Sequence, residues 1–163
     1  MTILFNKPNR QSLIFNLLLV VGGVILINGL IFSLEWSTRS PEKIVETPSF
    51  TPPGWVVGLV WTIWFTFLAI SRWIIGKSEN YKLNSNLVLI DILIISCLCY
   101  PFYSLAIGSV IGGFIGNVFA IFLSSYVFFR VLKKSKTAAW LIFPIIPWVT
   151  FATIITLFEV GII

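Results

Sequence analysis

Histidine is absent from this sequence of 163 residues, cysteine occurs twice, and charged residues make up only 10% of the chain. Histidine is the commonest metal ligand and a frequent general base, so its absence argues against most metal sites and most acid–base catalysis. Cys97 and Cys99 would point about 200° apart on a helix, which keeps them from pairing readily. Facing carboxylates and a serine-based triad are also absent from the sequence. We therefore predict no metal site, no bound cofactor and no ordinary acid–base active site.

The low charge content accompanies a high apolar content. Apolar residues account for 58% of the chain and aromatic residues for 16%, and the mean hydropathy is +1.00. A soluble domain carries about 25% charged residues, so this composition predicts an integral membrane protein whose partner is the lipid bilayer. The net charge of +5 would suggest nucleic acid in a soluble protein. Here the basic residues stand in short gaps between apolar runs, and we predict no nucleic-acid partner.

Five apolar runs divide the chain. A helix of about 20 residues spans the hydrocarbon core of a bilayer. The runs cover residues 12–34, 56–75, 84–102, 107–129 and 138–160. Because a helical bundle satisfies its backbone polar groups internally, we predict an all-α fold in which residues 1–163 form one membrane domain of five transmembrane helices. The first run is too long for a signal peptide, and no small-residue cleavage site follows it.

Lysine and arginine divide unequally between the two ends of the predicted helices. One side holds nine of them: Lys7, Arg10, Arg72, Lys77, Lys82, Arg130, Lys133, Lys134 and Lys136. The other side holds two, Arg39 and Lys43. Cytoplasmic loops carry the excess of basic residues. We therefore predict a cytoplasmic N-terminus and an external C-terminus, in what we expect to be a bacterial cell membrane, with the long first loop facing outward.

Polar and small residues interrupt three of the runs. Asn28 is expected to hydrogen-bond another helix. Asp91 lies near the start of the third run, where we expect it to be solvated and favoured by the helix dipole; the alternative is a functional intramembrane acid. Gly108, Gly112 and Gly116 recur every four residues. Such a face allows close helix approach, either between two copies of the chain or within one bundle.

Proline marks the second and fifth helices. Pro53 fits the first turn of a helix, where the missing N–H costs nothing, and Thr51 is the predicted N-cap. Pro144 and Pro147 remove backbone donors inside the fifth run, so we predict a kink or loosened turn there.

Tryptophan is the abundant side chain that is suited to ligand binding or to chemistry. Four of the seven tryptophans fall near helix ends, where tryptophan anchors a protein at the membrane interface: Trp36, Trp55, Trp73 and Trp140. Trp61, Trp64 and Trp148 lie deeper. Trp61 and Phe65 share one face of the second helix, and Trp148 and Ala152 share one face of the fifth. A pocket between these faces would suit a large planar ligand, although from spacing alone aromatic helix packing is the preferred interpretation.

Two blocks of sequence resemble a known family. Residues 48–55 read PSFTPPGW and lead into a V-W-x-x-x-[FY] run at Val60, Trp61 and Phe65. Residues 138–153 read AAWLIFPIIPWVTFAT, which is similar to an A-A-x-L-x-x-P-Y-L-x-W-x-x-F-A-T motif. Both motifs, in this order, resemble those of the tryptophan-rich sensory protein family, also called the translocator protein family.

The resemblance implies a five-helix bundle, often homodimeric, with a pocket on the side of the first loop. It implies binding of porphyrins such as haem and protoporphyrin IX, and in some members of sterols. It places Trp61, Phe65, Trp148 and Ala152 in the pocket, joined from the third helix by two further residues, Ser96 and Tyr100. Some bacterial members are reported to break down protoporphyrin in light with two tryptophans, which match Trp61 and Trp148.

Several positions depart from the family pattern. The lysine before the loop proline is Thr47, and the tyrosine after the first proline of the fifth helix is Ile145. In the third-helix block the expected asparagine is Ser96 and the expected tryptophan is Cys99. Both cysteines are interpreted as small apolar fillers, the alternative being a Cys99 thiolate on haem iron. The sterol-type tail motif has no counterpart, so a porphyrin is the better ligand prediction.

These observations lead to one main functional prediction. We predict a membrane receptor or sensor that binds a tetrapyrrole, porphyrin or haem, between its helices, possessing no catalytic residues. One alternative is an enzyme that degrades porphyrin with light or oxygen, initiated by Trp61 and Trp148. The other is a small-molecule transporter, against which the scarcity of intramembrane charge argues.

Overall fold

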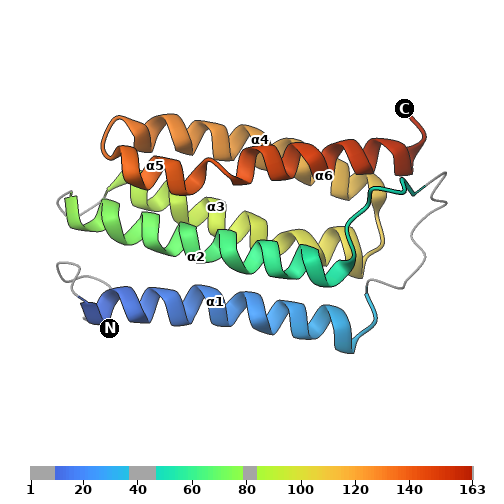
Figure 1. Ribbon diagram of the computed structural model, residues 1–163, viewed down its shortest axis with the longest axis horizontal. Coiled ribbons are helices and arrows are strands. Elements are labelled where there is room, and N and C mark those ends of the chain that lie inside the picture. Colours follow the sequence, from blue (N-terminus) through green and yellow to red (C-terminus); the bar gives the residue numbers. More distant parts are fainter. Residues whose placement is uncertain (1–9, 37–46, 79–83, 163) are drawn as a thin grey trace.

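The computed structural model describes residues 10–36, 47–78 and 84–162. Within these ranges, five helical segments are long and apolar enough to cross a membrane. They lie side by side and run alternately in opposite directions (Figure 1). The predicted all-α fold of five spans is confirmed. Its elements are α1 (Arg10–Ser33), α2 (Gly54–Ser78), α3 (Ser85–Pro101), η1 (Phe102–Ala106), α4 (Val110–Leu132), α5 (Lys136–Ile142) and α6 (Ile145–Val160).

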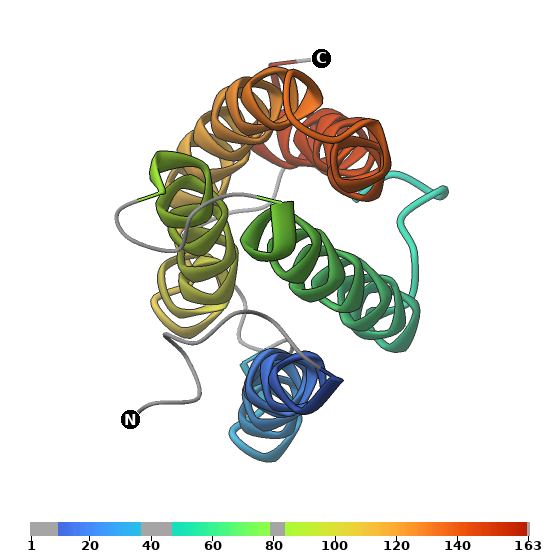
Figure 2. The ribbon, with the colours of Figure 1, turned by 90° about the vertical axis from the view of Figure 1, so that its left-hand side faces the viewer.

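The helices form three layers when the bundle is seen end-on (Figure 2). The middle layer is α2 and α3; α1 covers one side of it, and α4 with α5 and α6 covers the other. Much of α1 faces away from the bundle: the side chains of Leu18 and Leu26 are 69% and 65% exposed, which suits contact with lipid. Since α1 is apolar on every face, hydrophobic periodicity does not indicate which face it buries.

The link between the third and fourth spans differs from the prediction. The third run continues past Pro101 as a single π-helical turn, η1, a form that is uncommon in proteins. The fourth helix begins at Val110 rather than at residue 107, because Gly108 has a left-handed φ of 73°. The Ser109 hydroxyl then caps α4 by accepting a hydrogen bond from the backbone N–H of Gly112 at 3.0 Å.

The start of the second helix also differs in detail. Its first helical residue is Gly54, and the carbonyl of Pro53 accepts hydrogen bonds from the N–H groups of Val56 and Val57. The predicted N-cap, Thr51, does not cap the helix, since its hydroxyl is buried without a hydrogen-bond partner.

The predicted proline break in the last span is confirmed. The helix stops at Ile142 and starts again at Ile145, so that α5 and α6 are separate (Figure 1). Pro144 is the residue directly before α6. Pro147 lies in the first turn of α6, where a backbone N–H would have no intrahelical acceptor.

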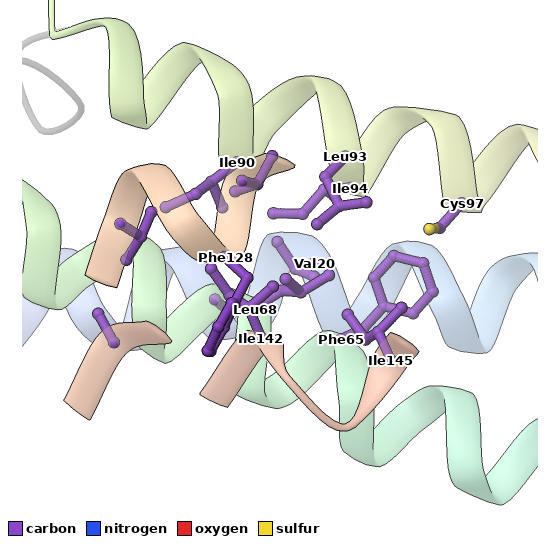
Figure 3. Close-up of a cluster of buried hydrophobic side chains, with 14 of the residues drawn as sticks. Val20, Phe65, Leu68, Ile90, Leu93, Ile94, Cys97, Phe128, Ile142 and Ile145 are labelled. Atoms are coloured by element: carbon purple, nitrogen blue, oxygen red, sulfur yellow. The ribbon is translucent and has the colours of Figure 1, made fainter. Parts of the chain in front are cut away.

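Buried apolar side chains fill the half of the bundle that contains α5 (Figure 3). Leu68 from α2, Ile90 from α3, Val131 from α4 and Ile142 from α5 all have 0% exposure. The Ser71 hydroxyl donates to the carbonyl oxygen of Ala138 at 2.9 Å and so joins α2 to α5.

A polar cluster joins the three helices α1, α2 and α3. Arg72 donates to both carboxylate oxygens of Asp91, from Nε at 2.5 Å and from Nη2 at 3.0 Å. Its Nη1 donates to the side-chain oxygen of Asn16 at 3.1 Å. Each of the three lies six residues, or about 9 Å, from the end of its helix. The Asp91 side chain is 38% exposed, in keeping with the preferred interpretation of a solvated acid, but its pairing with an arginine from the neighbouring helix was not predicted.

The glycines of the fourth span serve contacts within one chain. Gly108 lies outside α4 and cannot belong to a glycine face of that helix. A Cβ atom on Gly116 would collide with the phenol ring of Tyr103, and one on Gly113 would come within 3.3 Å of the Tyr100 hydroxyl. Of the two readings of this motif, packing within the bundle is the one these contacts favour.

Candidate functional site

One large cavity lies in the other half of the bundle, between α1, α2 and α3. Its volume is about 360 Å³. The wall from α1, the loop before α2 and the start of α2 consists of Val24, Ile27, Asn28, Ile31, Phe32, Thr51, Pro52, Gly54, Val57, Gly58, Trp61 and Phe65. The wall from α3 and η1 consists of Cys97, Leu98, Tyr100, Pro101 and Leu105. The cavity therefore lies at the end of the bundle where α1 ends and α2 begins.

Two aromatic rings of α2 form the inner part of this cavity. Trp61 and Phe65 are one helical turn apart, so their side chains lie on the same face. Their ring centroids are 5.6 Å apart with an interplanar angle of 42°. Phe65 is only 3% exposed and also belongs to the core, whereas Trp61 is partly buried. From Gly54 to Phe65 the cavity follows α2 for 11 residues, or about 16 Å.

The end of α3 borders both the large cavity and a second, smaller hollow. The hollow holds about 10 Å³, the size of one water molecule, and lies among Trp61, Ser96, Tyr100 and Asn117. The amide of Asn117 donates to the hydroxyl of Thr156 at 3.2 Å, which joins α4 to α6. Trp61 and Tyr100 line both spaces, so the hollow directly adjoins the large cavity.

The predicted pocket residues are thus only partly brought together. Trp61, Phe65 and Tyr100 line the large cavity, and Ser96 lines the adjoining hollow. Trp148 and Ala152 are not among the described residues of either wall. Trp148 packs against the buried core and has its ring centroid 5.9 Å from that of Phe151. The cause is the helix arrangement, because α6 packs mainly on α4 while α1 closes the cavity.

Two wall residues from α1 and the first loop were not predicted to face a pocket. Asn28 was expected to bond another helix, yet among the described residues its side chain has no hydrogen-bond partner. Thr51, the expected cap, lines the cavity as well. The polarity of Asn28 within an apolar run was the available signal, but its direction could not be read from a helix that is apolar all round.

Two contacts hold α1 against α2 and α3 on either side of the cavity. At one end is the hydrogen bond from Arg72 to Asn16. At the other end the ring of Trp36 meets that of Phe102 edge-on, with centroids 5.5 Å apart. Trp36 is 9% exposed, so it packs against η1 instead of anchoring the chain at the interface as predicted. Trp55 and Trp140, with 66% and 59% exposure, remain suited to that anchoring role.

The side chains that line the cavity are mostly apolar. Cys97 is buried beside the cavity and Cys99 is exposed, and both are free thiols. In the part of the chain that is described, no cluster of three potential metal ligands occurs. None of the described wall residues is charged. The arrangement can enclose a largely apolar molecule, stack it on an indole ring and offer it a few neutral hydrogen-bonding groups.

Comparison with known proteins gives two matches. The sequence model of the TspO/MBR family matches residues 15–159, a range that extends from the first span of the bundle into the last. A similar curated protein is the tryptophan-rich protein TspO of Bacillus cereus. It is 24% identical over 134 residues, which cover 80% of this chain and 84% of the relative.

Proposed function

Because this chain belongs to the TspO/MBR family, we propose that its role as a multi-pass membrane sensor or receptor is exercised by binding a tetrapyrrole in the cavity between α1, α2 and α3. The observation that carries the proposal is the cavity itself. Its volume of about 360 Å³ falls in the range of small-molecule sites, about 300–1,000 Å³. Trp61 offers an aromatic face in its wall, and a flat conjugated ring is the kind of molecule that such a face binds by stacking.

The proposal is tested by titrating purified protein with protoporphyrin IX and following the absorbance of the pigment. Stacking on an aromatic ring is worth about 1–3 kcal/mol at nucleic-acid sites, so Trp61→Ala should weaken binding about 5- to 150-fold. Trp61→Phe should cost less, because a ring remains. Trp73→Phe is the matched control, since Trp73 lies beside Lys77 far along α2 and outside the cavity wall. Unchanged affinity in Trp61→Ala would exclude this cavity as the binding site.

A variant of Trp148 distinguishes binding between the second and fifth spans from binding in the cavity between α1, α2 and α3. If the ligand is held by α1, α2 and α3, Trp148→Ala should change porphyrin affinity much less than Trp61→Ala. A larger loss in Trp148→Ala would favour the pocket between the second and fifth spans. Illumination separates binding from enzymatic degradation: bleaching that requires both tryptophans would favour the enzyme. The placement of Trp148 outside the cavity wall supports the binding protein over two-tryptophan chemistry.

A further inference from the structure

The cavity is apolar except for a few neutral groups, and two of these have unused hydrogen-bonding capacity. Asn28 and Thr51 line it together with valine, leucine, isoleucine, proline and aromatic side chains. The Thr51 hydroxyl is buried without a hydrogen-bond partner. The Asn28 amide has none among the described residues. Asn28 is half-buried, whereas the buried Thr51 hydroxyl without a partner is costly and calls for an explanation.

The position of Asn28 supplies such an explanation. Its side chain lies over Gly58 of α2, where a Cβ atom would come within 3.4 Å of Nδ2 and 3.6 Å of Oδ1. The absence of a side chain at Gly58 leaves room for the amide inside the cavity, one turn from Trp61 along α2. An amide held in this way can donate from Nδ2 and accept at Oδ1.

We propose that Asn28, assisted by Thr51, selects ligands that carry an uncharged hydrogen-bonding group, such as a carbonyl, on an otherwise apolar and planar framework. This rests on the proposed ligand cavity. The described wall has no cation for a carboxylate, and a buried carboxylate without a cation is far more costly than a neutral carbonyl. For a porphyrin, the wall therefore recognises the neutral macrocycle and its uncharged substituents.

The test uses two probes that differ in one group, 2-benzoylnaphthalene with a ketone and 2-benzylnaphthalene with a methylene in its place. Equilibrium dialysis against empty micelles measures the binding of each to the detergent-solubilised full chain. One hydrogen bond is worth about a two- to tenfold change in affinity. After correction for partition into empty micelles, the wild type should bind the ketone more tightly than the methylene compound by that factor. Asn28→Leu should abolish the preference, and Thr51→Val should reduce it.

Asn16→Leu is the matched control, because it makes the same substitution in the same helix outside the cavity wall, and it should keep the preference. A wild type without the preference would overturn the inference, as would an Asn28→Leu variant that keeps it. A parallel titration with protoporphyrin IX dimethyl ester separates this from the proposed function. Ketone preference without porphyrin binding would refute only the proposal that the ligand is a tetrapyrrole. Porphyrin binding without ketone preference would refute the role of Asn28 alone, and a chain that binds neither probe class would refute both.

Discussion

Removing the carboxylate of Asp91 should destabilise the bundle because the positive charge of Arg72 then loses its carboxylate partner inside the membrane span. In the native protein the guanidinium uses three of its N–H groups on Asp91 and Asn16. Asp91→Leu removes two of these acceptors and the negative charge. Breaking a buried pair from one side costs about 3–5 kcal/mol. The side chains of Arg72 and Asp91 are 16% and 38% exposed, so we take a lower value, about 2–3 kcal/mol.

The double variant Arg72→Met/Asp91→Leu should recover most of this loss. Replacing both charges with apolar groups of similar size is often neutral, because no charge is then left without a partner. We expect a stability within about 1 kcal/mol of the wild type. Asn16→Leu, which removes only one charge-assisted hydrogen bond, should cost about 1.5 kcal/mol.

The measurement is thermal unfolding in detergent. A change of 1 kcal/mol shifts the Tm of a chain of this size by about 2–4 °C, so Asp91→Leu should unfold about 5–10 °C below the wild type. The double variant should unfold close to the wild type. A double variant as unstable as Asp91→Leu would show that the loss comes from packing and not from the lost charge partner of Arg72. An unchanged single variant would refute the importance of the pair.

Three further outcomes follow from the fold. Gly116→Ala should destabilise the bundle by about 1–3 kcal/mol through overpacking against Tyr103, whereas Gly22→Ala, with open space around it, should be neutral or slightly stabilising in the same unfolding assay. The unequal distribution of basic residues predicts a cytoplasmic N-terminus and an external C-terminus, and reporter fusions giving a cytoplasmic C-terminus would contradict it. Association into homodimers is expected to survive Gly112→Leu if the glycines pack within one chain; complete conversion to monomers in native gels would instead place them at the subunit contact.

Helix number, fold class and the proline break were accessible from the sequence. Each depends on properties of contiguous residues: a run long enough and apolar enough to cross lipid, or a ring that lacks an N–H. The alignment of Trp61 with Phe65 has the same origin, since a spacing of four residues places two side chains on one helical face. The two motif blocks likewise indicated a family that the comparison with known proteins supports.

Tertiary structure decided which of these faces meet. Trp61 and Trp148 lie on correctly predicted helices, yet only Trp61 lines the large cavity, because α1 rather than α6 closes it. The rotation of α1, and with it the inward direction of Asn28, cannot be read from a helix that is apolar on all sides. The pairing of Arg72 with Asp91 is equally invisible in sequence, since it joins residues of two helices whose relative depth is set by packing. Local composition fixes what crosses the membrane, whereas contacts between helices determine what lies inside the bundle.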